Sequence, residues 1–544
     1  MEDFIFGTLA NDELKLIHHR AVRRGLQHNY QLSPLDPSPD QPVTITVQVG
    51  CDLGVEQVAC YYTVDGSLPV GEHGVALHGQ VIALKQVEVV WDTLSWGYLT
   101  IWQGVIPPQP EGAVVRYRIG AWAEGTAETF ADWPDVQLAI ERATSAFFRN
   151  EPMPDIVPGD LSGGHTFTYR VDRLGPPTWA RDAVIYHVFV DRFYPGDGRA
   201  WLQTDDLRDI CGGTLWGVRD KLDYIADLGV TCIWLSPIFV SPSHHGYDAT
   251  DYYHVEPRLG GENALRALID AAHARGIRIL LDLVCNHLSD QHPVFQEAYT
   301  DPGSPYRDWF IFDSSDIGYR TFFGVPSMPQ LNVENPAARQ WMIDIACFWL
   351  REFDVDGYRL DYALGPGPSF WSDFWAACKA AKPDSFCFGE IVDTPQLQRT
   401  YIGRLDGCLD FQMGDVLRKT FGRGQMTEEM LERFLERHLA FFPPNFLMPT
   451  FLDNHDMDRF IYIAAHDITA LQRAAAFQMR LPGPPIIYYG TEVGLSQPCG
   501  KADNVGAEIS RTLMLWGDDQ DRGLLEFYKT IIRQRQERRR SGRP

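Results

Sequence analysis

The sequence lacks two features that would place the protein in or across a membrane. No segment of its 544 residues approaches the roughly 20 consecutive apolar residues that a membrane-spanning helix needs. The chain begins Met1-Glu2-Asp3, with acidic residues where an export signal carries Lys or Arg, and no long apolar run follows. These absences predict a cytoplasmic protein that has no membrane partner.

Basic residues are also scarce. The chain has 48 Lys and Arg against 72 Asp and Glu, and its net charge is −24. Such an excess of negative charge does not favour contact with phosphate groups, so no nucleic-acid partner is expected. The charge balance instead suits a neutral substrate.

The ten cysteines form no metal-binding or disulfide spacing pattern, and the sequence contains no Cys-x-x-Cys. Cys232, Cys285, Cys347 and Cys387 lie inside apolar runs, where side chains are usually buried. We therefore predict buried free thiols, as in a cytosolic protein, rather than a disulfide framework.

A chain of 544 residues is too long for one ordinary core, so two or three domains are expected. Between Val43 and Trp122, short β-rich segments alternate with turn signals, which predicts an amino-terminal β-sandwich domain over residues 1–150. The residues before position 31 are irregular and receive no role. Four tryptophans of this domain favour a core role over a sugar-binding platform: Trp91, Trp96, Trp102 and Trp122.

Residues 151–178 are rich in Pro, Gly and Asp, and we predict a linker there. From residue 179, strand-like apolar segments alternate with helical patterns, which is typical of parallel βαβ units. We place the strands near residues 184–190, 230–236, 278–284, 356–361, 385–390, 407–411, 447–453 and 485–489. They predict an α/β protein whose (β/α)₈ barrel spans residues 179–541. The alternation breaks over residues 288–335, which predicts a small loop-rich domain inserted after the third strand.

Four polar blocks follow apolar segments of the predicted barrel, where buried strands would deliver side chains to a rim. They are Asp282–His287, Gly357–Asp361, Phe388–Glu390 and Phe451–Asp456. Because the carboxyl ends of parallel barrel strands converge on one face, chemistry is expected to collect at these blocks.

In order, spacing and residue type, the four blocks resemble the four signature regions of the α-amylase family of glycoside hydrolases. Another stretch, Met328–Asn332, resembles a conserved block of the branch that contains neopullulanases, cyclomaltodextrinases and maltogenic amylases. The resemblance implies a TIM barrel and an α-glucan substrate. Relatives usually add a carboxyl-terminal β domain, but here only a basic tail follows the last helical pattern, so that domain is expected to be absent.

The resemblance implies three catalytic carboxylates. Asp361 matches the nucleophile, Glu390 the acid/base, and Asp456 the carboxylate that grips the hydroxyls of the cleaved ring. Arg359 lies two residues before Asp361 on a predicted strand, so both point the same way, and the guanidinium should keep Asp361 ionised. An apolar setting such as Phe388 would keep Glu390 protonated near neutral pH.

The resemblance also implies contacts to the sugar ring at the cleaved bond. The residues are Arg359, His287, His455, Tyr247, His245 and Asp248. A lone His or Tyr is more often structural, but two imidazoles and an aromatic residue inside these motifs favour ligand contacts.

No cofactor is expected to be required. Structural calcium is a secondary hypothesis that follows from the resemblance, with Asn286 as a candidate ligand at one site and Asp197 at a second. Thr214 stands where the family has an acidic ligand, which removes one charged oxygen of the kind that Ca²⁺ prefers.

The resemblance implies hydrolysis, with retention, of α-1,4-glucosidic bonds in maltooligosaccharides, cyclodextrins, pullulan or starch. One alternative is a glucanotransferase, in which transglycosylation to a sugar hydroxyl replaces hydrolysis at the same site. Another is a non-catalytic carbohydrate-binding protein. Val392 and Asp393 depart from the Trp and His that the branch usually has after the acid/base, which alters the leaving-group side. Relatives with an amino-terminal domain often form homodimers, so a homodimer is a further hypothesis.

Overall fold

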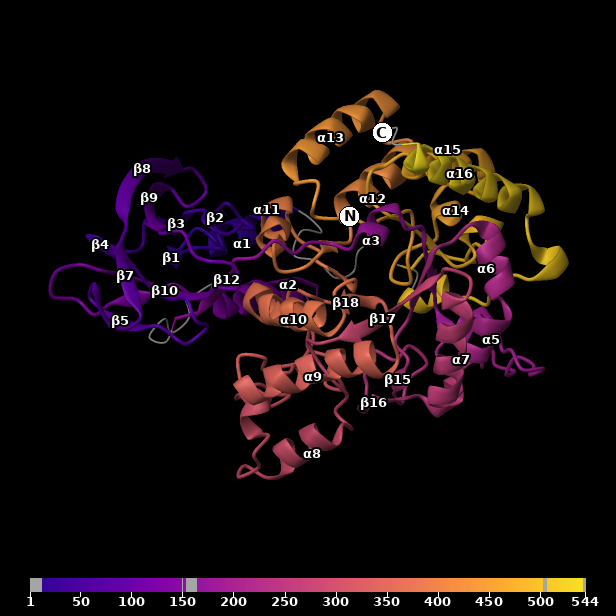
Figure 1. Ribbon diagram of the computed structural model, residues 1–544, viewed down its shortest axis with the longest axis horizontal. Helices are drawn as coiled ribbons and strands as arrows, with labels where there is room; N and C mark the ends of the chain where they lie inside the picture. Colours follow the sequence, from indigo (N-terminus) through magenta and orange to yellow (C-terminus); the bar gives the residue numbers. More distant parts are fainter. Residues whose placement is uncertain (1–11, 149, 153–163, 502–505, 542–544) are drawn as a thin grey trace. The chain divides into compact units, whose positions relative to one another are not determined.

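The structure is a computed structural model that describes residues 12–148, 150–152, 164–501 and 506–541 (Figure 1). The chain forms two compact units. The first comprises Met1–Gly175, Leu364–Trp375 and Val392–Leu405, and the second comprises Pro176–Ala363, Ala376–Ile391 and Asp406–Pro544. Two short segments from the predicted barrel therefore cluster with the amino-terminal unit, which the sequence did not indicate.

The first unit contains two five-stranded antiparallel sheets and a hairpin of β5 and β6, as expected for the predicted β domain. One has the strand order β1-β3-β9-β8 with β2 beside β3, and the other has the order β11-β10-β4-β7 with β12 beside β10. Buried and partly exposed residues alternate along much of β3 and β10, so one face of each strand packs on a core. The strands are β1 (Leu26–Gln27), β2 (Leu32–Ser33), β3 (Val43–Val49), β4 (Gln57–Thr63), β5 (Val70–Glu72), β6 (Val75–His78), β7 (Gln80–Ala83), β8 (Lys85–Asp92), β9 (Gly97–Ile106), β10 (Val114–Trp122), β11 (Thr129–Phe130) and β12 (Phe167–Arg170). The helices are α1 (Asp12–Ala21), α2 (Pro134–Phe148), α11 (Pro395–Gln398) and the first part of α10 (Gly367–Ala381).

The predicted linker over residues 151–178 is corrected in its second half. Residues 153–163 lie outside the described residues, but β12 follows them and pairs with β10 from Tyr117↔Phe167 to Val114↔Arg170. Phe167 and Tyr169 are buried. A short strand whose alternate aromatic residues enter the core is easily missed between Pro- and Gly-rich neighbours.

The tryptophans of the first unit divide between core and surface. Trp102 and Trp122 are buried, whereas Trp91 and Trp96 are 45% and 75% exposed. The Trp91 ring contacts the rings of Trp96 and Tyr98 edge-to-face, with centroids 5.5 and 5.0 Å apart. These three residues lie on or beside the edge strand β8 and are called the aromatic patch below.

The second unit is a barrel of eight parallel strands, which confirms the predicted fold. Hydrogen-bonded neighbours follow the order β20-β19-β18-β17-β14-β13-β22-β21, and a parallel bridge between Gly407 and Leu447 closes the ring. The strands are β13 (Ile185–Val188), β14 (Cys232–Leu235), β17 (Arg278–Val284), β18 (Gly357–Asp361), β19 (Phe386–Gly389), β20 (Gly407–Cys408), β21 (Thr450–Phe451) and β22 (Pro485–Tyr488). Each lies within a segment that the sequence predicted.

Helices separate the barrel strands along the chain (Figure 1). In α7 the buried residues Ala264, Leu265, Leu268, Ile269 and Ala272 recur at helical spacing, so one face packs inward. The helices are α3 (Thr178–Asp182), α4 (Val190–Phe193), α5 (Leu215–Asp220), α6 (Leu222–Leu228), α7 (Gly261–His273), α8 (Pro293–Thr300), α9 (Pro336–Glu352), α10 (Gly367–Ala381), α12 (Phe411–Leu417), α13 (Glu428–Phe441), α14 (Phe460–Ile463), α15 (Ile468–Gln478) and α16 (Arg522–Arg540). Across the described ranges, no helix combines the length and apolarity needed to cross a membrane.

Two irregular segments follow barrel strands. A hairpin of β15 (Phe239–Val240) and β16 (Asp251–Val255) follows β14. The predicted loop-rich insertion after β17 contains α8, a 3₁₀ turn (Arg307–Trp309) and isolated β-bridges. It returns to the barrel through a bridge between His287 and Gln330.

Candidate active site

A buried arginine on β18 connects the carboxylates that the sequence proposed as catalytic. Arg359 Nη1 donates to Asp361 Oδ1 at 2.8 Å and to Asp282 Oδ1 at 2.7 Å, and Nη2 lies 2.8 Å from Glu390 Oε2. One planar guanidinium therefore holds both catalytic candidates on the same side of the barrel. This arrangement is compatible with the separation of about 5–5.5 Å that a retaining carboxylate pair uses.

Strand geometry explains why these groups meet. Arg359 and Asp361 are two residues apart on β18, so their side chains point to the same side. Glu390 directly follows the neighbouring parallel strand β19, which pairs with β18 up to Leu360↔Gly389. The register thus brings the end of one strand beside the end of the other.

Asp282 belongs to the same cluster, although the sequence analysis gave it no role. It is fully buried on β17, and its Oδ2 accepts from Trp234 Nε1 and from the Tyr247 hydroxyl, each at 3.0 Å. Burial raises the pKa of Asp282 to about 7, while the charge of Arg359 opposes the rise. Asp282 therefore fixes both Arg359 and Tyr247 in position.

Burial dominates the ionisation of the two central carboxyls. It raises the pKa of Glu390 to about 8; Arg359 opposes this shift, and the charges of Asp361 and Asp456 add to it. Burial also raises the pKa of Asp361 above its usual value, again against Arg359. Arg359 alone would lower the pKa of Asp361, as predicted from the sequence, but burial reverses the direction of the shift.

Asp456 lies in the loop after β21 and is held by basic groups. Its Oδ1 accepts from Arg511 Nη2 at 2.9 Å, and its Oδ2 lies 3.1 Å from His455 Nε2. Burial opposes ionisation, but the contact with His455 and the charge of Arg511 keep the pKa of Asp456 well below its usual range. Its side chain is 22% exposed, against 10% for Asp361 and 11% for Glu390, so it is the most accessible of the three to a sugar hydroxyl.

Tyr247, His455 and His287 form a chain of contacts beside the carboxylates. The ring of Tyr247 stacks on that of His455 with centroids 5.3 Å apart, and its hydroxyl lies 2.6 Å from His455 Nε2. His287 Nε2 lies 3.1 Å from the carbonyl oxygen of Tyr247. Burial lowers the pKa of His455 to about 3 and that of His287 to about 4, so both rings are neutral near pH 7.

His245 and Asp248 are joined less directly to this cluster. His245 Nδ1 accepts from the backbone N–H of Tyr247 at 3.1 Å, and the two rings lie 5.9 Å apart. Asp248 Oδ1 instead accepts from the hydroxyls of Ser241 and Ser243. The structure therefore brings His245 beside Tyr247, while Asp248 shapes the turn that carries both.

The inserted segment supplies aromatic rings next to the cluster. Phe322 stacks on His287 with ring centroids 4.7 Å apart. Phe322 and Phe323 also pack edge-to-face against Tyr362, the residue after Asp361, at 5.0 and 5.2 Å. The insertion thus contacts one signature block and the residue that follows another.

The two candidate calcium ligands make hydrogen bonds within the protein. Asn286 Oδ1 already accepts from Gln330 Nε2 at 3.2 Å, and Asp197 lies in a turn whose N–H donates to Asp220. Thr214 uses its hydroxyl to cap α5 and to donate to the carbonyl oxygen of Pro195. Among the residues that the structure describes, no group of three or more His, Cys, Asp or Glu side chains is arranged to hold a metal ion.

Sequence reasoning missed two groups that hold the site in place. Asp282 had a usable signal, because a charged residue inside an apolar strand is seldom without a partner. No local sequence signal indicated Arg511, since it lies in an irregular segment after the last strand, β22. Besides its bond to Asp456, Arg511 Nε donates to the carbonyl oxygen of His455 at 2.9 Å.

The site thus places two adjacent carboxyls at the carboxyl ends of parallel barrel strands, and one of them has the raised pKa of an acid. Retaining glycoside hydrolases use this arrangement. Comparison with known families agrees with this class. Residues 187–530 match the family model described as "Alpha amylase, catalytic domain". The chain therefore belongs to the α-amylase catalytic-domain family, and the resemblance drawn from the motifs is confirmed.

The relatives include members of the branch indicated by residues 328–332. "Alpha-amylase 2" of Dictyoglomus thermophilum is 41% identical over 367 residues, which are 67% of this chain and 64% of that protein. "Neopullulanase 2" of Thermoactinomyces vulgaris is 35% identical over 392 residues, 68% of this chain and 65% of that protein. A solved structure named "Cyclomaltodextrinase" has a TM-score of 0.63 and 26% identity, and the match covers 94% of this chain and 84% of that one. The chain thus spans just under two thirds of the length of these two curated relatives.

Proposed function

We propose that this protein is a retaining glycoside hydrolase that cleaves α-1,4-glucosidic bonds in maltooligosaccharides, cyclodextrins, pullulan or starch. The observation that carries the proposal is the single guanidinium of Arg359, which holds Asp361 and Glu390 together at neighbouring strand ends. The names of a neopullulanase and a cyclomaltodextrinase among the relatives support an α-glucan substrate.

In the first step, the Asp361 carboxylate attacks the anomeric carbon while Glu390 gives its proton to the glycosidic oxygen. The bond to the leaving sugar breaks, and a glycosyl ester forms on Asp361. Arg359 orients the nucleophile, while Asp456 and the neutral ring of His455 bind hydroxyls as the sugar flattens towards an oxocarbenium-like state.

In the second step, water enters where the leaving sugar was. Glu390, now a carboxylate, removes a proton from the water as its oxygen attacks the anomeric carbon. The ester bond breaks, Asp361 returns as a carboxylate, and Glu390 regains its proton. Two inversions at the same carbon give net retention.

The pKa of Glu390 predicts the alkaline limb of the pH profile. The acid must be protonated, so kcat/KM should fall as pH rises through about 8. Asp361 must be ionised, so kcat/KM should also fall at acidic pH, and this limb should lie above the usual carboxyl range because burial raises the pKa of Asp361. The measurement is kcat/KM against pH on a chromogenic maltooligosaccharide. With a leaving group that needs no proton, Glu390→Gln should lose the alkaline limb; an unchanged limb would show that another group is the acid.

A glucanotransferase would use the same first step and differ only in the acceptor of the second. We expect hydrolysis of maltotriose to give glucose and maltose without longer oligomers, and product analysis over time checks this. Longer oligomers would assign the site to transfer instead. The same assay across β-cyclodextrin, pullulan and soluble starch defines the preferred substrate. Failure to release reducing sugar from any of them would favour a non-catalytic carbohydrate-binding protein.

The assembly and location of the protein stay predictions. The homodimer is supported by the aromatic patch, because an edge strand with exposed apolar side chains is a ready surface for a second chain. A cytoplasmic location is supported by the ten cysteines, which are all free thiols.

A further inference from the structure

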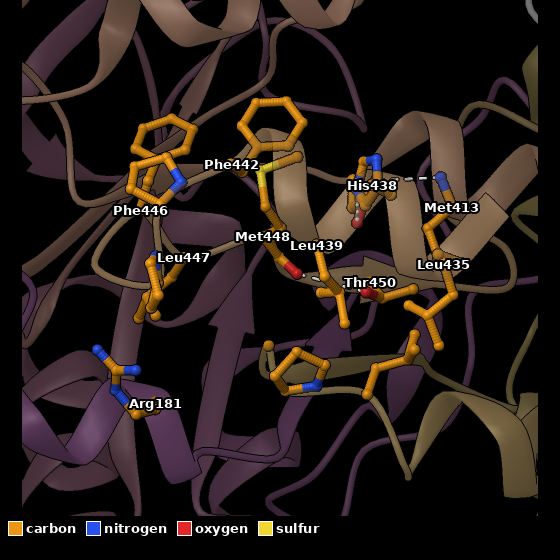
Figure 2. Close-up of a pocket in the computed structure, with 16 residues that line it drawn as sticks. Arg181, Met413, Leu435, His438, Leu439, Phe442, Phe446, Leu447, Met448 and Thr450 are labelled. Carbon is orange, nitrogen blue, oxygen red and sulfur yellow. Dashed lines mark hydrogen bonds and ion pairs between the residues drawn. The ribbon is translucent and has the colours of Figure 1, made fainter. Parts of the chain in front are cut away.

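The barrel unit contains an apolar cavity that the proposed reaction does not use. Its volume is about 250 Å³, and Figure 2 shows the side chains that surround it. Most are apolar and come from α13, from the segment before β21 and from the segment before β22; examples are Leu435, Phe442, Phe446, Met448 and Leu481. Phe442, Phe446 and Leu481 are buried, whereas Leu439 and Arg181 are exposed, so the cavity has a packed inner part and a side that faces solvent.

Several residues that line the cavity lie at the opposite end of the barrel strands from the carboxylate cluster, whereas Asp410 and Met413 follow β20. Met448 precedes β21, Leu481 precedes β22, and Arg181 precedes β13. The catalytic candidates instead end or follow strands β18, β19 and β21. Because all eight strands are parallel, these two sets of residues occupy opposite edges of the barrel.

One ion pair, between His438 and Asp410, lines the inner wall. His438 Nε2 lies 3.0 Å from Asp410 Oδ2, and Asp410 Oδ1 accepts from the N–H of Met413 at 3.0 Å. Both side chains of the pair are buried. The interior of the cavity therefore presents an essentially apolar surface to a ligand.

The mouth of the cavity is basic. Arg181 lines it and is exposed; Figure 2 shows this side chain below Leu447, apart from the aromatic rings. Arg535 and Arg538, on the last helix, donate to backbone carbonyls of residues 479–483, the segment that forms one wall. Arg539 donates to the same segment, and its nearest carboxylate is Asp182 at 3.7 Å from Nε.

The guanidinium groups around the mouth repel one another. Burial lowers the pKa of Arg539; Asp182 acts against this, and the charges of Arg181 and Arg538 lower the pKa further. This local excess of positive charge stands out in a chain whose net charge is −24. An anion at the mouth would relieve the repulsion between the guanidinium groups.

We propose that this cavity is a binding site for a small amphipathic carboxylate, with its hydrocarbon body in the apolar interior and its carboxylate on Arg181. The size agrees: an apolar cavity of about 150 Å³ takes up benzene, so 250 Å³ accommodates a body of about eight carbon atoms. A guanidinium binds a carboxylate through paired N–H donors. Octanoate is therefore the matching probe.

Calorimetry and thermal unfolding with octanoate, 1-octanol and acetate test the proposal. Octanoate should bind and raise the Tm saturably, while acetate lacks the apolar body and octanol lacks the charge, so both should bind more weakly. Arg181→Gln should weaken octanoate binding by about tenfold and leave octanol unaffected. Arg533→Gln, which removes an exposed arginine from the same helix as Arg539, is the matched control and should change neither.

A second variant tests the cavity itself. Leu439 lines the cavity and is 46% exposed, so Leu439→Trp should be tolerated by the fold and should obstruct the entrance. We expect it to abolish octanoate binding while maltotriose hydrolysis continues at the wild-type rate, and saturating maltotriose should not displace octanoate. Equal affinity for octanol and octanoate, an unchanged affinity in Arg181→Gln, or no binding at millimolar octanoate would each overturn the proposal.

Discussion

Asp361→Asn is expected to reduce kcat/KM on maltotriose by at least about 10⁴-fold, because an amide cannot form the glycosyl ester. The fold should persist, since Arg359 keeps its bond to Asp282 and its ion pair with Glu390. Burial raises the pKa of Asp361, which means that the ionised carboxylate costs stability at neutral pH. The Tm of the variant should therefore equal or exceed that of the wild type.

The control for this experiment is Asp223→Asn. Asp223 is an exposed carboxylate on α6 that pairs with Arg275 at 2.8 Å and is not part of the cluster. Its replacement should change neither kcat/KM nor the Tm by a measurable amount. Wild-type activity in Asp361→Asn, with the control unchanged, would refute the assignment of the nucleophile.

Arg359→Met is expected to have the second-largest effect, because it leaves three carboxyls without their common cation. Breaking a buried ion pair typically costs about 3–5 kcal/mol of the free energy of unfolding. The charge of Arg359 lowers the pKa of Asp282, Asp361 and Glu390, so its removal should raise all three. The loss of stability should therefore be greater at alkaline than at mildly acidic pH, where these groups are protonated.

Activity distinguishes a positioning role for Arg359 from a merely structural one. If Arg359 sets the ionisation of the nucleophile, the acidic limb of kcat/KM should move to higher pH in Arg359→Met. Arg359→Lys restores the charge but not the planar fork that spans two carboxylates, so it should return the acidic limb towards its original position and recover only part of kcat. A variant that loses stability while its pH profile stays unchanged would contradict the role.

The barrel and its reactive residues could be predicted because each signal is local in the sequence. Every barrel strand is a short apolar segment, and parallel strands must place their carboxyl ends together. Arg359 and Asp361 share one strand, so their proximity follows from its two-residue period. The position of Glu390 could be predicted because the strand that it follows, β19, lies beside β18, which is the ordinary outcome of a βαβ unit.

What could not be predicted depends on contacts between distant residues. Arg511 reaches Asp456 from a segment without a motif. In the first unit, His18 lies 3.3 Å from Asp393, and the hydroxyl of Tyr30 lies 2.6 Å from that of Ser369. These contacts attach two segments of the predicted barrel to the amino-terminal unit. No local sequence pattern around these four residues indicates which residue each one contacts. The predicted direction of the pKa shift of Asp361 was wrong for a similar reason, since burial is a property of the packed structure.

Direct capture of the covalent intermediate decides whether Asp361 is the nucleophile. A fluorinated α-maltosyl fluoride, which slows hydrolysis of the glycosyl-enzyme, can be incubated with the protein and followed by proteolysis and mass spectrometry. We predict one added fluorinated maltosyl group, as an ester on the peptide that contains Asp361, and its absence in Asp361→Asn. A label on another carboxylate, or turnover with an inverted anomeric product and no label, would contradict the retaining mechanism.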